Sequence, residues 1–209
     1  MRSLGRRRNL VIGIILLVVV LIPGYVRMFV IVGDSDAPAF TTGDRVIVSL
    51  AAYDIRVPYS GQRMVRLRDP RPGDMVLFRL TDGSLAVKRV VAGPGTRIAM
   101  RDNHITIDGV ELEYVAVAVH EKEAVMPGAS GPVVEIERGN GLEVCISFHH
   151  GGSLGDFEEE IVPEDQYFVL GSNRDDSMDS RQFGPLPRER VLGKIIGRIG
   201  SPRLGTTDD

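Results

Sequence analysis

Two side chains in the sequence could together carry out nucleophilic chemistry, one a hydroxyl and the other an amine. Ser35 lies in GDSDAPAF (33–40), between an extended apolar stretch and a turn that contains a proline. Lys88 lies in LAVKRVV (85–91), which is otherwise almost wholly apolar. If this lysine faces the interior, its desolvation favours the neutral amine that a general base requires. A buried Lys88 could then take a proton from a serine hydroxyl.

The local sequence leaves other interpretations open for both residues. A serine beside Gly and Asp is more often a turn residue that bonds its own backbone. Alternation along a strand does not decide whether Lys88 or Arg89 faces inward, so Lys88 could also face water. Neither residue is therefore assigned to catalysis by its neighbours alone.

The elements that must position these side chains are short strands. Each is rich in β-branched residues and bounded by Gly, Pro or Asp, and no stretch after residue 34 keeps a helical period for three turns. Asp108-Gly109 separates two short apolar runs, which predicts a tight hairpin turn. We predict a mainly β fold with coiled antiparallel sheets, built from strands at 28–32, 45–50, 75–80, 85–91, 105–107, 167–171 and 191–199.

The composition of the chain changes from about residue 114 to about residue 161. Glycines and acidic residues become more frequent there, and PGASGP and HHGGSLGD interrupt the apolar pattern. We therefore predict a catalytic β domain formed by residues 28–113 and 162–200, a β-rich insertion at 114–161, and a flexible tail at 201–209.

The N-terminus has the pattern of a membrane anchor. Four arginines, at positions 2 and 6–8, precede an uncharged run from Leu10 to Val26. A helix of that length rises about 26 Å, slightly less than a hydrocarbon core of roughly 30 Å. The arginine excess predicts a cytoplasmic N-terminus and an extracytoplasmic catalytic domain. A cleavable secretory signal is the alternative, but no small-x-small site closes the run, so we predict that residues 1–27 form an uncleaved tip and single-pass anchor.

Several classes of partner and cofactor are disfavoured. The formal net charge of −3 provides no basic excess for nucleic acid. The single cysteine, Cys145, excludes an intramolecular disulfide, and we expect it to be a small buried side chain. His149 and His150 would point apart on a strand, and the acidic run at 158–160 is typical of a solvated turn, so we predict no metal and no cofactor.

Three ordered segments carry a resemblance to a known family. The first runs from Gly33 to Pro38 with Gly43-Asp44 after it, and the second pairs GDMVLF (73–78) with KRVVAGPG (88–95). The third is GSNRDDSMDSRQFG (171–184). Together with the anchor, they resemble the type I signal peptidases, membrane-bound Ser/Lys proteases that remove leader peptides from exported preproteins. The resemblance extends over the anchor and nearly all of residues 28–113 and 162–199.

The resemblance implies a role for each matched residue. Ser35 corresponds to the nucleophile, and its N–H to an oxyanion donor. Lys88 corresponds to the general base, Ser177 to a residue that orients its amine, and Asp179 with Arg181 to a supporting ion pair. It further implies cleavage after small residues at the −3 and −1 positions, with signal peptides and membrane lipid as partners.

The sequence departs from the family pattern at positions near the expected site. Asp36 replaces the usual methionine after the nucleophile, and Gly33 offers no side-chain hydroxyl, so both are candidate substrate-groove residues. Ser172 replaces the usual aspartate of the last segment. A carboxylate near Lys88 would stabilise its charged form and weaken it as a base, whereas in an extended backbone Asp36 would point away from Ser35.

We therefore predict a membrane-anchored serine endopeptidase of the signal peptidase I type. Two alternatives remain: a catalytically inactive relative that binds signal peptides, and a specialised processing peptidase with few secreted substrates. The departure at Asp36 motivates both.

Overall fold

The protein is described by a computed structural model that covers residues 24–57, 60–117, 133–149 and 155–199. Its largest element is a seven-stranded antiparallel sheet with the strand order β1-β2-β16-β5-β6-β14-β15. The strands are β1 (Val26–Val30), β2 (Arg45–Ser49), β5 (Met75–Arg79), β6 (Leu85–Ala92), β14 (Gln166–Leu170), β15 (Leu186–Pro187) and β16 (Val191–Ile199).

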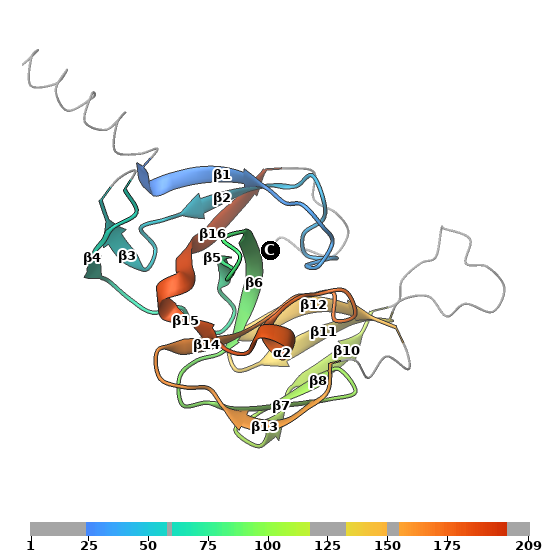
Figure 1. Ribbon diagram of the computed structural model, residues 1–209. Coiled ribbons are helices and arrows are strands. Elements are labelled where there is room, and N and C mark those ends of the chain that lie inside the picture. The colour runs from blue at the N-terminus through green and yellow to red at the C-terminus, as the bar shows by residue number, and fades with distance from the viewer. Residues whose placement is uncertain (1–23, 58–59, 118–132, 150–154, 200–209) are drawn as a thin grey trace, which may run out of the picture.

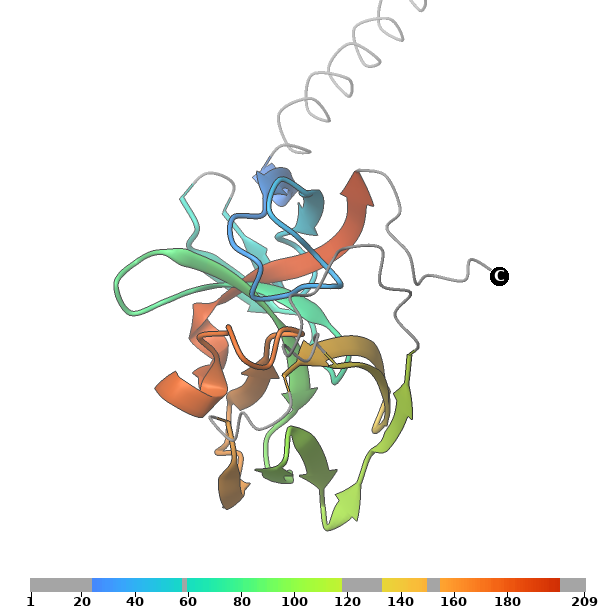
Figure 2. The same cartoon turned by 90° about the vertical axis from the view of Figure 1, so that its right-hand side faces the viewer.

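Three smaller sheets complete the described part. They are the hairpin of β3 (Asp54–Arg56) and β4 (Arg63–Arg66), the sheet of β10 (Glu113–Ala116), β11 (Val133–Gly139) and β12 (Leu142–Phe148), and a sheet ordered β13-β7-β8-β9. The last contains β7 (Arg97–Arg101), β8 (His104–Ile107), β9 (Val110–Glu111) and β13 (Phe157–Ile161), and it lies at the opposite end of the molecule from β1 and β2 (Figures 1 and 2). The short helices are α2 (Ser180–Phe183) and the 3-10 turn η1 (Arg188–Arg190).

The predicted mainly β, antiparallel fold is confirmed. Each of the seven expected strands overlaps an observed one, because alternating and β-branched residues bury one or both faces of a sheet. The expected hairpin turn is also present: Ile107 pairs with Val110, and both intervening residues, Asp108 and Gly109, have positive φ angles. Positive φ at both central residues is the requirement of a tight hairpin turn.

The predicted anchor lies almost wholly outside the described residues. Strand β1 begins at Val26 and so contains Val26 and Arg27, which we had assigned to the anchor segment. In the ranges that the structure describes, no helix has the length and hydropathy needed to cross a membrane.

The segment predicted as an insertion takes part in two different sheets. Its residues form most of β10-β11-β12, whereas β13 pairs with β7 of the segment before it. The division into domains stays a prediction. One position of β12 reaches the large sheet, because Ser147 forms an isolated bridge with Asn173, which follows β14.

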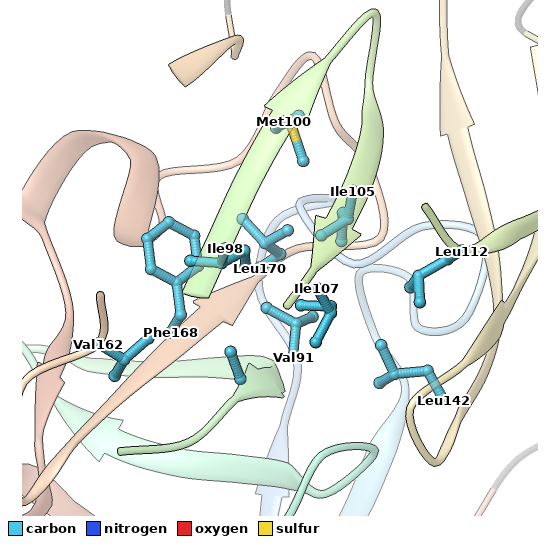
Figure 3. Close-up of a cluster of buried hydrophobic side chains, with 11 residues drawn as sticks. Val91, Ile98, Met100, Ile105, Ile107, Leu112, Leu142, Val162, Phe168 and Leu170 are labelled. Atoms are coloured by element: carbon cyan, nitrogen blue, oxygen red, sulfur yellow. The ribbon is translucent and has the colours of Figure 1, made fainter. Parts of the chain in front are cut away.

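Apolar side chains fill the space between the sheets. Figure 3 shows one such cluster, in which residues of β7 and β8 lie next to Phe168 and Leu170 of β14. A second cluster contains Val76, Val90 and Val169, which come from β5, β6 and β14. These two clusters hold β6 and β14 rigidly against each other. Lys88 lies on β6, and Ser177, Asp179 and Arg181 follow β14.

Candidate active site

Lys88 faces the interior from the middle of β6. Its side chain is 4% exposed, and its partner across the sheet is Val76 of β5. Arg89, the next residue, donates a hydrogen bond from Nη1 to the carbonyl of Gly73 at 2.9 Å. Of the two orientations that the sequence left open, the inward one for Lys88 is observed.

Ser35 lies on a turn rather than on an extended segment. Ala37 N donates to Asp34 O at 3.0 Å and Phe40 N to Asp36 O at 2.9 Å, so the chain folds back directly after the serine. The carbonyl of Ser35 accepts a hydrogen bond from Asn173 N at 3.1 Å, and Asn173 Nδ2 donates to the carbonyl of Asp34 at 3.3 Å. The segment after β14 therefore fixes the backbone of the turn that bears the hydroxyl.

The structure brings the two predicted reactive groups into contact. Nζ of Lys88 lies 2.5 Å from Oγ of Ser35, which is within the distance for proton transfer along a hydrogen bond. The Ser35 N–H has no acceptor among the described residues. It is thus available to donate to an oxygen that becomes negative next to Oγ.

Asp36 also turns toward Lys88, contrary to the alternative in which an extended backbone would point it away. Its Oδ2 lies 3.2 Å from Lys88 Nζ, and Ser172 N donates to its Oδ1 at 3.4 Å. Asp36 is only 4% exposed. Burial raises the pKa of the Asp36 carboxyl above its ordinary value, although the Lys88 amine and the Ser172 N–H act in the opposite direction. The carboxylate thus faces the base, and the assignment of Asp36 to the substrate groove stays a prediction.

Ser172, where the family usually has an aspartate, contacts the site through its backbone. Its N–H binds Asp36, and its carbonyl accepts a hydrogen bond from Ser147 N at 2.9 Å. Its own hydroxyl is buried without a hydrogen-bond partner among the described residues. No carboxylate is therefore supplied from position 172, and the one beside the lysine comes from the nucleophile turn.

Asp179 and Arg181 form an ion pair at the start of α2. Arg181 Nε and Nη2 each lie 2.8 Å from a different Asp179 oxygen, and both side chains are almost fully buried. Gly171 N also donates to Asp179, at 3.0 Å. Burial alone would raise the pKa of the Asp179 carboxyl, but the guanidinium and the Gly171 N–H outweigh it and hold this pKa below its usual value. The pair anchors the segment that in turn holds Ser35.

Ser177 does not make the contact that the resemblance implied. Its Oγ is buried and forms no hydrogen bond among the described residues, to Lys88 or to any other group. It comes close enough to Asp179 to contribute to the lowered pKa of that carboxyl. Ser177 packs instead beside Gly171, next to the carbonyl of Ser35. Its orienting role stays a prediction.

Gly33 lies on the exposed approach to the nucleophile turn. Its φ angle is +93°, and a Cβ built on it would meet no atom within 4 Å. Its N–H donates to Thr42 Oγ1 at 3.0 Å, and Thr42 donates back to Asp34. The open space beside Gly33 is suited to a residue of the substrate groove, and this role of Gly33 stays a prediction.

Some residues that support the site were not predicted. Ser147 of β12 donates from Oγ to the carbonyl of Ala37 at 3.2 Å, so the insertion touches the nucleophile turn. Glu137 is fully buried and accepts from Arg174 Nη2 and from Tyr114, each at 2.8 Å. Arg174 belongs to the last motif and could have been suspected, whereas nothing in the sequence around Ser147 or Glu137 indicates a link to the site.

These features define a class of protein. An antiparallel β framework holds a buried lysine amine in contact with a serine hydroxyl, as in hydrolases with a Ser/Lys pair. Comparison with known families agrees. The model of the family described as signal peptidase, peptidase S26, matches residues 6–199, and the chain belongs to this family.

Individual relatives are distant in sequence. The chain is 29% identical over 181 residues to a probable signal peptidase I-2 of Synechocystis sp., covering 82% of this chain and 63% of that protein. It is also 29% identical over 196 residues to a signal peptidase I of Pseudomonas fluorescens, covering 88% and 68%. The chain thus spans about two thirds of the length of these curated relatives. A crystal structure of a signal peptidase I from Enterococcus faecalis is similar at 25% identity and a TM-score of 0.36, covering 62% of this chain and 98% of that one.

Proposed function

We propose that this protein is a membrane-anchored serine endopeptidase that removes signal peptides from exported preproteins. The observation that carries the proposal is the 2.5 Å separation of Lys88 Nζ and Ser35 Oγ, with the lysine buried. Membership of the S26 family and the names of the relatives support the choice of substrate class. The run of apolar residues before Val26 supports a single-pass anchor with the catalytic part outside the cytoplasm.

The chemistry follows from the contact between the two residues. The neutral amine of Lys88 takes the proton of Ser35 as Oγ attacks the scissile carbonyl carbon, and the carbonyl electrons move to oxygen. The Ser35 N–H donates to that oxyanion. Lys88 then gives its proton to the leaving amine, the C–N bond breaks, and an acyl-enzyme remains on Ser35. The same amine then deprotonates a water molecule, which attacks the ester carbonyl. The C–O bond to Ser35 breaks, Oγ takes the proton back from Lys88, and the acid product leaves.

The remaining matched residues have supporting parts in this proposal. Asp179 and Arg181 hold the segment at 171–174 that fixes the Ser35 carbonyl, so they position the nucleophile from a distance. Ser177 makes no hydrogen bond to Lys88 among the described residues, so its orienting role rests on the family resemblance alone. Gly33 leaves room for an extended signal peptide with small residues at −3 and −1.

One observation favours a different function, that of an inactive signal-peptide-binding relative. A carboxylate 3.2 Å from a buried amine stabilises the ammonium, and an ammonium cannot act as a base. The two functions make opposite predictions about turnover, because an inactive relative would bind a preprotein and leave it whole.

The test is cleavage of a purified preprotein by the detergent-solubilised full chain. We expect a single cut, located by mass spectrometry after small residues at −3 and −1, which is lost in Ser35→Ala and in Lys88→Met. Binding without cleavage by the wild-type chain would support the inactive relative. Equal cleavage by wild type and Ser35→Ala would overturn the assignment of the nucleophile.

A further inference from the structure

Asp36 is the second side chain of the nucleophile turn, after Ser35, that contacts the base. Its two oxygens divide between Lys88 Nζ, at 3.2 Å, and the Ser172 N–H, at 3.4 Å. In the described ranges no other carboxylate lies within salt-bridge distance of Lys88. The carboxylate thus joins the strand that carries the base to the segment that follows β14.

From these contacts we infer that Asp36 is a positioning residue that orients the Lys88 amine toward Ser35 and shares one proton with it. This inference rests on the proposed function. The orienting contact that the resemblance assigned to Ser177 is made here by Asp36, since Ser177 Oγ makes no hydrogen bond among the described residues. The site is accordingly a Ser35–Lys88–Asp36 relay rather than an isolated dyad.

Sharing one proton explains how Lys88 can lie beside a carboxylate and still act as a base. With one proton on the pair, the ammonium of Lys88 passes it to the Asp36 carboxylate, leaving a neutral amine and a neutral carboxyl. The amine then takes the proton of Ser35 as Oγ attacks, and later delivers it to the leaving nitrogen. After deacylation the Asp36 carboxyl returns its proton to Lys88. Between these two transfers Asp36 keeps its proton, and no other donor is needed.

The surroundings of Asp36 favour the neutral form of this pair. Both side chains are about 95% buried, so a charged pair loses most of its hydration. Of the charged groups around Asp36, Lys88 is in contact and Arg89 acts from the same strand. Arg89 in turn interacts with Glu137 and Arg174, which carry opposite charges and form their own ion pair. Burial raises the pKa of the Asp36 carboxyl, in agreement with a carboxyl that holds a proton.

A pH profile distinguishes proton sharing from simple inhibition of the base. Asn at position 36 mimics a neutral carboxyl, so in Asp36→Asn the ammonium ionises alone. The wild-type pair loses its first proton at a lower pH than the lone ammonium of Asp36→Asn does, because two coupled sites can release that proton. The second leaves at a higher pH, because the carboxylate holds the ammonium. The acid limb is the fall of kcat/KM at low pH. It follows the loss of the first proton if the neutral pair is the active form, and the loss of the second proton if Asp36 is an ionised carboxylate in the active form.

The experiment compares pH profiles of kcat/KM for the detergent-solubilised full chain and its variants. The substrate is an internally quenched peptide with Ala at −3 and −1. Proton sharing predicts that Asp36→Asn moves the midpoint of the acid limb to higher pH by about one unit, because the lone ammonium has no second site that releases its proton. We expect KM to change less than threefold and Asp36→Glu to restore the wild-type limb. Asp175→Asn, which removes a nearby carboxylate that faces His149, is the matched control and should leave the limb in place.

The opposite shift would overturn the inference. If Asp36→Asn moves the acid limb to lower pH, Asp36 only stabilises the ammonium of Lys88. If the limb does not move, the protonation of Asp36 has no effect on activity. Asp36→Met provides a second neutral side chain should Asp36→Asn fail to fold, with the same expected direction. Absence of peptide cleavage by the wild-type chain would instead refute the proposed function itself, so the two failures are distinguishable.

Discussion

Gly171 lies where the segment anchored by Asp179 and Arg181 meets the nucleophile turn. A Cβ at this position would overlap the carbonyl oxygen of Ser35 and Oγ of Ser177, and it would lie 2.7 Å from Cβ of Ser177. The Gly171 backbone is not in the left-handed region, so the penalty for Gly171→Ala comes from these contacts. Because the Ser35 carbonyl belongs to the backbone, the turn itself must move by about 1 Å to reach a normal separation.

The expected consequences follow from that displacement. A shift of about 1 Å in a reacting group can cost on the order of 100-fold in rate. Overpacking a buried position costs about 1–3 kcal/mol, which for a domain of this size lowers Tm by roughly 3–9 °C. We therefore expect Gly171→Ala to lose about 100-fold in kcat/KM while remaining folded, as measured by peptide cleavage and by thermal unfolding followed by circular dichroism.

Gly197→Ala is the matched control for this substitution. A Cβ at Gly197 would meet its nearest neighbour, Ile47, at an ordinary 3.7 Å, and its backbone is likewise outside the left-handed region. We expect wild-type activity and a change in Tm of less than about 2 °C. If Gly171→Ala retained full activity, or if both variants lost activity equally, the proposed coupling of the Ser35 turn to the segment after β14 would be refuted.

Two further predictions concern the residues around α2. Asp179→Asn leaves Arg181 buried and unpaired, which should destabilise the fold by about 3–5 kcal/mol at pH 7. The pKa of Asp179 is lowered in the folded state, so its contribution to stability is fully present above its unfolded pKa of about 3.9 and is lost as pH falls through its folded pKa. Urea unfolding at pH 7 and pH 3 should therefore show a smaller difference in unfolding free energy between wild type and variant at pH 3. A constant difference would contradict the ion-pair account. Ser177→Ala removes a hydroxyl that has no hydrogen bond among the described residues, so it should change the unfolding free energy by less than about 1 kcal/mol. Urea unfolding tests this expectation, and a loss above about 2 kcal/mol would show that the hydroxyl is bonded.

The antiparallel strands could be predicted because their apolar residues recur in short runs bounded by turn residues. The strand at 85–91 was predicted within one residue, and the Asp108-Gly109 turn was predicted correctly because few dipeptides favour positive φ at both positions. The start of β1 was misplaced, since Val26 ends an apolar run that does not distinguish membrane helix from edge strand.

The candidate site was predicted from the order of three motifs, and its contacts were not. Periodicity could not decide the direction of Lys88, because both faces of β6 are largely covered. The direction of Asp36 depended on a turn at 34–40 that is fixed by hydrogen bonds from residues about 140 positions later in the chain. Contacts such as Ser147 with Ala37 arise from the packing of distant segments, for which the local sequence carries no signature.

The central claim, that Ser35 is the nucleophile activated by Lys88, can be tested by intact-mass spectrometry of acid-quenched reactions with a short signal-peptide substrate. The account predicts a covalent adduct with the mass of the acyl portion of the substrate, mapped to the peptide that contains Ser35, and no adduct in Ser35→Ala or Lys88→Met. An adduct on another residue, or cleavage that persists without Ser35, would contradict it.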